Sequence, residues 1–178
     1  MSVAPFSILF KQFFPDAVSD SAYSIDFEAL YEKGCRGIIF DVDNTLVPHG
    51  APADGRAKKL FERLHEIGYK CLVLSNNKEP RVKSFAESVR YADYIHKAGK
   101  PGKKGYFAAL KRMCLRRKEA LFVGDQIFTD VWGAKRCGIF SILVKPIDKR
   151  EEIQIVLKRI PERFVLWLYG RSGKLRRL

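Results

Sequence analysis

Short apolar runs alternate with longer stretches of helical periodicity between residues 36 and 145. Each run is about as long as a buried strand, and the longer stretches repeat their apolar residues every three or four positions, like a helix with one buried face. Strands are expected at Gly37 to Phe40, Lys70 to Leu74, Tyr91 to Ile95, Glu119 to Val123 and Phe140 to Val144. This alternation is typical of βα units, so the pattern predicts an α/β domain with a parallel sheet.

Helical stretches fill the gaps between these strands. Pro80 suits the first turn of the second helix, and Gly138 suits the end of the fourth. The positions that define the four helices are Ala57, Leu60, Phe61, Leu64 and Ile67; Val82, Phe85, Ala86 and Val89; Phe107, Leu110 and Cys114; and Val131, Ala134 and Lys135.

Two aromatic segments flank this core, at residues 1–35 and 151–178. The second has helical spacing from Ile153 to Ile160 and continues into an aromatic run that ends at Tyr169, followed by a basic tail. We expect both flanks to cover the edge or the faces of the sheet. The alternative is that the aromatic and basic residues of the second flank lie in a membrane interface. Burial of Trp167 and Tyr169 would weaken that alternative.

Length and charge narrow the class of protein. The chain has 178 residues, which suits one domain with a substantial core, so we treat residues 1–178 as a single domain. Hydrophobic residues make up 47% and charged residues 30%, as in ordinary globular proteins, but the formal net charge of +13 is unusual. Such a charge favours an anionic partner: nucleic acid, lipid headgroups or phosphorylated small molecules.

Several features indicate a cytoplasmic location. No stretch reaches the roughly 18 consecutive apolar residues of a membrane span, and the run from Ser7 to Phe10 lacks the basic segment of a secretory signal. The four cysteines are far apart, which argues against a zinc site, and Cys35 and Cys71 suit buried free thiols in a reducing compartment. We expect a cytoplasmic protein, with peripheral contact to the inner face of the membrane left open.

Two carboxylates, Asp41 and Asp43, follow the first apolar run directly. A buried strand does not hold carboxylates in its interior, so both acids are expected at the strand's carboxyl edge, where open α/β sheets bind ligands. Residues i and i+2 of an extended chain point the same way, so the two could converge on one cation or one phosphorus atom unless a turn separates them. An Asx turn with a helix cap explains the same residues, and the pair alone does not decide.

Three further polar sites follow predicted strands. Ser75 and Asn76 come after the second, Lys100 lies in a Gly/Pro loop, and Gly124 precedes the acids Asp125 and Asp130, five residues apart. Each also has a structural explanation: Ser75 and Asn76 suit a turn or a helix cap, Lys100 suits a solvated lysine, and Asp130 suits a helix cap. Phosphoryl transfer needs an aligned nucleophile, a divalent cation, a hydroxyl or amide donor and a fixed positive charge, and together these sites supply them.

The set of motifs resembles that of the haloacid dehalogenase (HAD) superfamily: Asp-x-Asp-x-Thr, a Ser or Thr after a strand, a Lys, and Gly-Asp-x-x-x-x-Asp. The resemblance covers about residues 36–145 and implies a three-layer, Rossmann-like core. It also implies a phosphatase in which Asp41 is the nucleophile that forms an aspartyl-phosphate and Asp43 is the general acid and base.

The same resemblance implies a Mg²⁺ cofactor and a phosphate-binding set. The ion would be held by Asp41, the backbone carbonyl of Asp43 and Asp125, with Asp130 a ligand through water or an orienter of Lys100. Ser75 and Lys100 would bind the phosphoryl group, with help from Asn76.

The spacing of the motifs bears on the substrate. About 30 residues separate Asp41 from Ser75 and about 25 separate Ser75 from Lys100, so neither gap fits a folded cap domain. A capless, open site favours a large or surface-bound phosphomonoester. Lys97 to Lys118 contains nine Lys or Arg and no Asp or Glu, which suggests a surface for a polyanion, although a solvated helix face is the usual meaning of such a run.

Within the superfamily the motif forms resemble most closely the YqeG-type phosphatases of subfamily IIIA, which are related to the mitochondrial phosphatidylglycerophosphate phosphatase. The resemblance implies a membrane-surface phosphatase that acts on an anionic lipid headgroup, with phosphatidylglycerophosphate as the leading substrate.

Three other functions are compatible with parts of the pattern. A receiver domain uses acids, Mg²⁺, Ser or Thr and Lys, but in a different order along the chain. An open basic site would also serve a phosphatase of nucleic-acid ends or of phosphoproteins. A third possibility is an RNA-binding module without turnover, although few aromatic residues for base stacking lie in the basic run.

Overall fold

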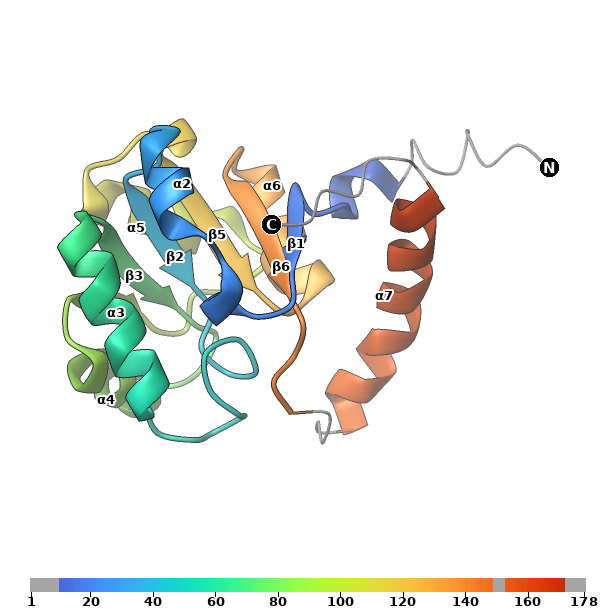
Figure 1. The fold of residues 1–178 in the computed structure, drawn as a ribbon. Coiled ribbons are helices and arrows are strands. Elements are labelled where there is room, and N and C mark those ends of the chain that lie inside the picture. Colours follow the sequence, from blue (N-terminus) through green and yellow to red (C-terminus); the bar gives the residue numbers. More distant parts are fainter. Residues whose placement is uncertain (1–9, 149–152, 172–178) are drawn as a thin grey trace.

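The computed structural model describes residues 10–148 and 153–171, with side chains from residue 161 onward in the second of these segments. Six parallel strands form one sheet in the order β1-β6-β5-β2-β3-β4 (Figure 1). The strands are β1 (Ala17–Ser19), β2 (Gly37–Phe40), β3 (Lys70–Leu74), β4 (Ala92–Ile95), β5 (Ala120–Gly124) and β6 (Phe140–Val144). The predicted parallel α/β sheet is confirmed, and the five expected strands are present with ends shifted by at most one residue.

Helices cover both faces of the sheet. They are α2 (Phe27–Glu32), α3 (Gly55–Ile67), α4 (Glu79–Val89), α5 (Lys103–Met113), α6 (Trp132–Arg136) and α7 (Ile153–Arg171). Ile38 and Phe40 of β2 pack in the cluster that contains α2, α3 and α4, whereas Ile39 packs in the cluster of α5 and α6. Alternate residues of a strand point to opposite faces, so a strand buried on both sides reads as a continuous apolar run. This is the expected three-layer core.

The two flanks pack against each other at the β1 edge of the sheet. Phe14 packs against Tyr169 of α7 with ring centroids 5.2 Å apart, and β1 pairs with β6 through Ala17 and Ile142. The flanks therefore cover the edge, as expected. The other side of α7 is open to solvent: Tyr169 is 1% exposed, but Trp167 is 49% exposed.

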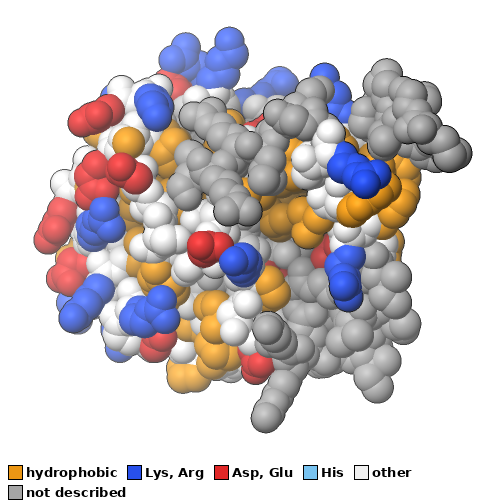
Figure 2. Space-filling model, turned by 45° about the vertical axis from the view of Figure 1, so that its right-hand side comes forward, with side chains coloured by type: hydrophobic (Ala, Val, Ile, Leu, Met, Phe, Trp, Pro, Cys, Tyr) orange, Lys and Arg blue, Asp and Glu red, His pale blue; other side chains and the backbone are white. Residues whose placement is uncertain are grey.

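The outer side of α7 combines apolar and basic residues. Phe164 is 48% exposed, and the Arg171 guanidinium lies 4.4 Å from the ring centroid of Trp167. Figure 2 shows hydrophobic side chains beside Lys and Arg side chains on this side of the molecule. The basic tail beyond Arg171 lies outside the described residues, so the membrane contact stays a prediction.

The connections around the predicted site are short. Between Asp41 and Ser75 the chain forms α3 and β3, and between Ser75 and Lys100 it forms α4 and β4. Residues 10–148 thus contain no folded insertion at either position where a cap would lie, as expected. None of the helices in the described ranges is long and apolar enough to span a membrane. All four cysteines are free thiols, with Cys71 and Cys137 buried.

Candidate active site

Parallel pairing of β2 and β5 brings two of the predicted acids together. Asp41 follows β2 and Asp125 follows β5, and the backbone N–H of Asp41 donates to the carbonyl of Val123 at 2.9 Å. Carboxylate oxygens of Asp41, Asp125 and Asp130 all lie within 4.8 Å of one another, and all three residues are buried. Residues from two strand ends therefore form one acidic cluster at the carboxyl edge of the sheet.

A turn after β5 carries Asp130 back to the strand end. Residues Ile127–Val131 form one turn of π-helix, and the N–H of Gln126 donates to Asp130 Oδ2 at 3.1 Å. Gly124 is required here, because an added Cβ would lie 2.5 Å from Asp130 Oδ2. The Thr45 hydroxyl donates to Asp125 Oδ1 at 3.2 Å, which fixes that carboxylate.

Lys100 places its ammonium group in this cluster. Its Nζ donates to Asp41 Oδ1 at 2.6 Å and to Asp130 Oδ1 at 2.7 Å. The side chain of Asn76 holds the lysine's backbone from both sides, since its Oδ1 accepts from Lys100 N at 2.8 Å and its Nδ2 donates to Lys100 O at 3.1 Å. Asn76 thus positions Lys100, and its predicted contact with phosphate stays a prediction.

Ser75 lies beside this cluster at the end of β3. Its Oγ accepts from the N–H of Asn77 at 3.2 Å. Ser75, Asp41 and Lys100 together line a polar hollow of about 180 Å³, to which Gln126 and Thr129 also contribute. The structure therefore brings the predicted nucleophile, hydroxyl and lysine to one hollow, while the role of each stays a prediction.

Asp43 lines the same hollow, but its carboxylate has a different set of partners. It accepts from Arg81 Nη2 at 2.9 Å, from Asn77 Nδ2 at 2.7 Å and from the N–H of Gly50 at 2.8 Å. Burial acts to raise the pKa of Asp43, but the hydrogen bonds from Arg81, Gly50 and Asn77 outweigh it and lower the pKa. The carboxylates of Asp41 and Asp43 thus have separate environments. We therefore expect any metal contact of Asp43 to come from its backbone carbonyl and not from its carboxylate.

The electrostatics of the cluster fit a bound cation. Burial raises the pKa of Asp41 to about 6, although the nearby Lys100 ammonium opposes the shift. Burial alone would lower the pKa of Lys100, but Asp130 and Asp41 outweigh it and raise the pKa. Among the residues that the structure describes, three buried carboxylates face the Lys100 ammonium, so negative charge is in excess. A hard divalent cation such as Mg²⁺, which prefers carboxylate oxygens, would balance that excess.

Comparison with known proteins identifies the family. The haloacid dehalogenase-like hydrolase family matches residues 50–138. A Bacillus subtilis protein named Probable phosphatase YqeG is 37% identical over 169 residues, which cover 94% of this chain and 98% of that protein. The chain belongs to the haloacid dehalogenase-like hydrolases. The resemblance to YqeG-type proteins that the motifs indicated is confirmed.

Other relatives of this hydrolase are more distant. Phosphatidylglycerophosphate phosphatase 1, chloroplastic/mitochondrial, of Arabidopsis thaliana is 29% identical over 156 residues, which cover 79% of this chain and 42% of that protein. The cobalt-bound deoxy-D-mannose-octulosonate 8-phosphate phosphatase of Haemophilus influenzae matches with a TM-score of 0.52 at 13% identity, covering 79% of this chain and 92% of that one. At that identity the structural match shows the fold alone.

Some residues of the hydrolase's site carry no signal in the sequence. Arg81 reaches Asp43 from the first turn of α4, and Glu162 of α7 accepts from the N–H of Ile127 at 2.8 Å while only 4% exposed. Neither belongs to a motif or a periodic pattern. The expected start of a helix at Pro80 could have placed Arg81 at this edge of the sheet, but not on Asp43.

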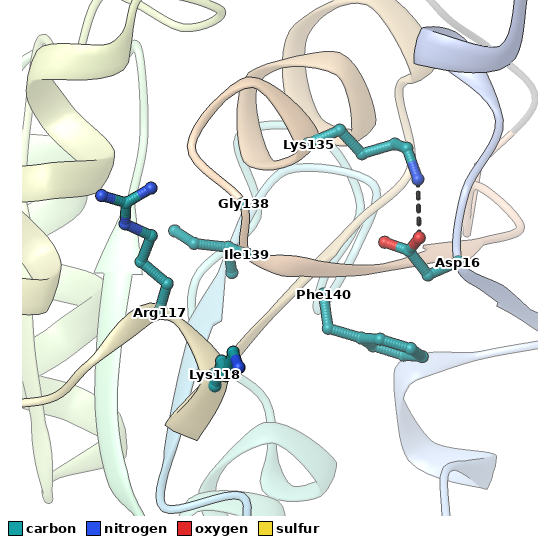
Figure 3. Close-up of a pocket in the computed structure, with 7 residues that line it drawn as sticks. All are labelled: Asp16, Arg117, Lys118, Lys135, Gly138, Ile139 and Phe140. Atoms are coloured by element: carbon teal, nitrogen blue, oxygen red, sulfur yellow. Dashed lines mark hydrogen bonds and ion pairs between the residues drawn. The ribbon is translucent and has the colours of Figure 1, made fainter.

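The basic segment of the hydrolase does not lie wholly beside the site. It starts at Lys97, close to Lys100, runs along α5 and ends at Arg117 and Lys118, which precede β5 at the opposite edge of the sheet. There they line another hollow, in which Lys135 pairs with Asp16 at 2.6 Å (Figure 3). None of the predicted site residues lines this hollow, so only the first part of the basic segment is close to the acidic cluster.

Proposed function

We propose that the protein is a Mg²⁺-dependent phosphatase that hydrolyses phosphomonoesters through an aspartyl-phosphate on Asp41. The observation that carries this proposal is the buried ammonium of Lys100, which lies 2.6 Å from Asp41 and 2.7 Å from Asp130, with Asp125 in the same acidic cluster. A nucleophile, a fixed cation and an excess of carboxylates meet in one hollow, as phosphoryl transfer requires. The names of the Bacillus and Arabidopsis relatives support the same activity.

The first half of the proposed reaction transfers the phosphoryl group. A carboxylate oxygen of Asp41 attacks phosphorus while the bond from phosphorus to the ester oxygen breaks. Protonated Asp43 gives its proton to the leaving alkoxide and becomes the carboxylate. Lys100 and Ser75 hold the phosphoryl oxygens. The Mg²⁺ ion, held by Asp41, Asp125 and the backbone of Asp43, would offset the negative charge of the phosphate and the carboxylates.

The second half releases inorganic phosphate. The Asp43 carboxylate takes a proton from water, whose oxygen attacks phosphorus and breaks the bond to Asp41. Asp43 is then protonated again and Asp41 is a free carboxylate, so each group returns to its first state. Arg81, Asn77 and the N–H of Gly50 stabilise the ionised Asp43 that this half requires.

We further propose that the substrate is an anionic lipid headgroup, with phosphatidylglycerophosphate as the leading candidate. The protein would then be cytoplasmic and bind peripherally to the membrane. An open site without a cap, a net charge of +13, and the exposed Phe164, Trp167 and Arg171 of α7 support a membrane-bound substrate. The name of the Arabidopsis relative supports the same lipid.

Phosphate release from phosphatidylglycerophosphate in mixed micelles with Mg²⁺ tests this proposal, with Asp41→Asn as the control. We expect Mg²⁺-dependent release by the wild type and none above background by the variant. Equal release by both proteins would contradict the lipid substrate. Faster release from phosphorylated oligonucleotides or phosphopeptides than from the lipid would favour the other two substrate classes.

A further inference from the structure

A cavity of about 510 Å³ lies between α7 and the carboxyl ends of β1 and β6. Its described wall includes the apolar side chains of Val18, Ile127, Leu143, Leu166 and Tyr169. The volume is within the range of sites that bind small molecules. The active-site hollow is smaller, at about 180 Å³.

One turn of the chain separates this cavity from the active site. Asp125 and Ile127 line the cavity, whereas Gln126 and Thr129 line the polar hollow that contains Asp41. Asp125 also belongs to the acidic cluster. A ligand with a phosphate in the polar hollow therefore has an apolar space on the other side of this turn.

The charged groups in the cavity wall pair within the protein or, like Asp125, belong to the acidic cluster of the active site. Glu162 accepts a hydrogen bond from the N–H of Ile127, and Lys145 lies 2.5 Å from Asp20. That ion pair is exposed, with side chains 74% and 82% accessible, so it marks a side of the cavity that faces solvent. The apolar part of the wall, formed by Val18, Leu143 and Leu166 among others, favours a hydrocarbon.

We propose that this cavity binds an acyl chain of the substrate, so that the enzyme acts on amphiphilic phosphomonoesters with the phosphate at Asp41 and the chain between β6 and α7. The proposal rests on the proposed phosphatase function and adds a binding site for the apolar part of the substrate. A membrane lipid is the source that the surroundings favour. Leu166 is 37% exposed and lies on α7 near the exposed Phe164 and Trp167, so a chain leaving a bilayer at this helix would meet the cavity wall.

Hydrolysis of monomeric substrates of graded chain length tests the proposal. Glycerol 3-phosphate is compared with 1-acyl-glycerol 3-phosphates of increasing chain length, each below its critical micelle concentration and with Mg²⁺ present. We expect kcat/KM to rise with chain length, through KM, until the cavity is filled. No dependence on chain length below the micelle concentration would overturn the proposal.

The variant Leu166→Asn tests whether the dependence on chain length arises in this cavity, because Leu166 lines it. Leu166 is also partly exposed, so we expect the variant to fold. We expect the ratio of kcat/KM for the longest ester to that for glycerol 3-phosphate to fall about tenfold. Phe107→Asn is the matched control: Phe107 is 41% exposed on α5 and is not among the cavity's described lining residues, so the ratio is expected to stay at the wild-type value.

Two other outcomes have distinct meanings. An unchanged ratio in Leu166→Asn would overturn the proposal and would indicate that the chain binds elsewhere or that a segment of this protein fills the cavity. Phosphate release from none of the esters above an Asp41→Asn control would instead contradict the phosphatase function, and the acyl site with it.

Discussion

Asp41 and Asp43 are two residues apart, yet the fold gives their side chains opposite environments. Burial raises the pKa of Asp41 to about 6, and its carboxylate meets Lys100 and two other acids. Asp43 has a lowered pKa, because hydrogen bonds from Arg81, Gly50 and Asn77 outweigh its burial. The lowered pKa of Asp43 favours its ionised form, which is the form that takes a proton from water in the second half of the proposed reaction.

Asp43→Asn tests the proton-transfer role. With 4-nitrophenyl phosphate, whose leaving group needs no proton, we expect phosphorylation of Asp41 to persist and its hydrolysis to slow, because the base for water is lost. Turnover should fall by roughly 10²–10⁴-fold, with a burst of one nitrophenol per active site in rapid-mixing experiments. A variant that turns over at the wild-type rate would contradict the assigned role.

Gly124→Ala tests the close packing of the turn after β5. The added Cβ would lie 2.5 Å from Asp130 Oδ2 and 2.7 Å from Asp130 Cβ, so Asp130 or the strand end must move. We expect a loss of about 1–3 kcal/mol in the free energy of unfolding and reduced phosphate release.

Gly55→Ala is the matched control for that substitution. A Cβ at this position, the first residue of α3, meets nothing within 4 Å. Calorimetry should show unchanged or slightly raised stability for this variant. Equal effects of the two substitutions would argue against a special requirement at Gly124.

Sequence reasoning located most of the candidate site because its residues follow strands in a fixed order of motifs. Parallel pairing then places Asp41, Ser75 and Asp125 at one edge of the sheet without any knowledge of side-chain contacts. The contacts of Arg81 and Glu162 could not be found in the same way. They depend on the position of a helix relative to the sheet, which no local pattern encodes.

At the scale of elements, α7 is joined to the turn that carries the acidic cluster. Glu162 accepts from the N–H of Ile127, which lies between Asp125 and Asp130, while Val165 and Leu168 are buried on the same helix. A displacement of α7 would therefore reach the residues proposed to hold Mg²⁺. Contact of the helix with a membrane could act on the active site by this route.

Substitutions of Glu162 test this link. Glu162→Ala leaves the buried N–H of Ile127 without its acceptor, which costs about 1–3 kcal/mol and loosens the turn. We expect the Mg²⁺ concentration for half-maximal activity to rise severalfold in this variant. Glu162→Gln keeps an acceptor oxygen and should stay near the wild type. If Ala and Gln both match the wild type in a Mg²⁺ titration, the contact has no part in metal binding.

Elements differ in how well the pattern of residues predicts them. The five longer strands and the helices between them repeat their apolar residues over several positions, so each was predicted from the sequence. The third helix is present as α5, but Phe107 and Cys114 were wrongly expected on its buried face: both are exposed, and Cys114 lies just beyond the end of the helix. β1 has only three residues and was missed, because its pairing with β6 depends on the packing of the aromatic lead-in against α7. Similarly, no periodicity indicates the π-helical turn after β5, which follows from the return of Asp130 to Gly124.

At the scale of the whole molecule, an open site, a net charge of +13 and an exposed aromatic helix favour an anionic membrane surface. Part of the basic segment lies at the far edge of the sheet, so charge is spread over the molecule and does not surround the site alone. The apolar residues of α7 would then determine which side of the protein faces the membrane, and the positive charge would strengthen its attraction to the anionic surface.

Vesicle binding measures the contribution of charge and the contribution of the apolar residues of α7 separately. We expect the protein to bind vesicles that contain anionic lipid, with affinity that falls as salt rises, and to bind neutral vesicles weakly. The double substitution Phe164→Ala, Trp167→Ala should weaken binding to the anionic vesicles. Tyr91→Ala, which removes a ring with the same 49% exposure as Trp167 outside α7, should not. Equal loss in both variants in a sedimentation assay would argue against α7 as the contact.

The most direct test of the central claim is the covalent state of Asp41 during turnover. The protein is mixed with a phosphomonoester and Mg²⁺, quenched in acid within one turnover, and digested for mass spectrometry. We predict one phosphoryl group on the peptide that contains Asp41, located at that residue, and its loss when Mg²⁺ is chelated beforehand. Turnover without a phosphorylated Asp41, or with the phosphoryl group on another residue, would contradict the account.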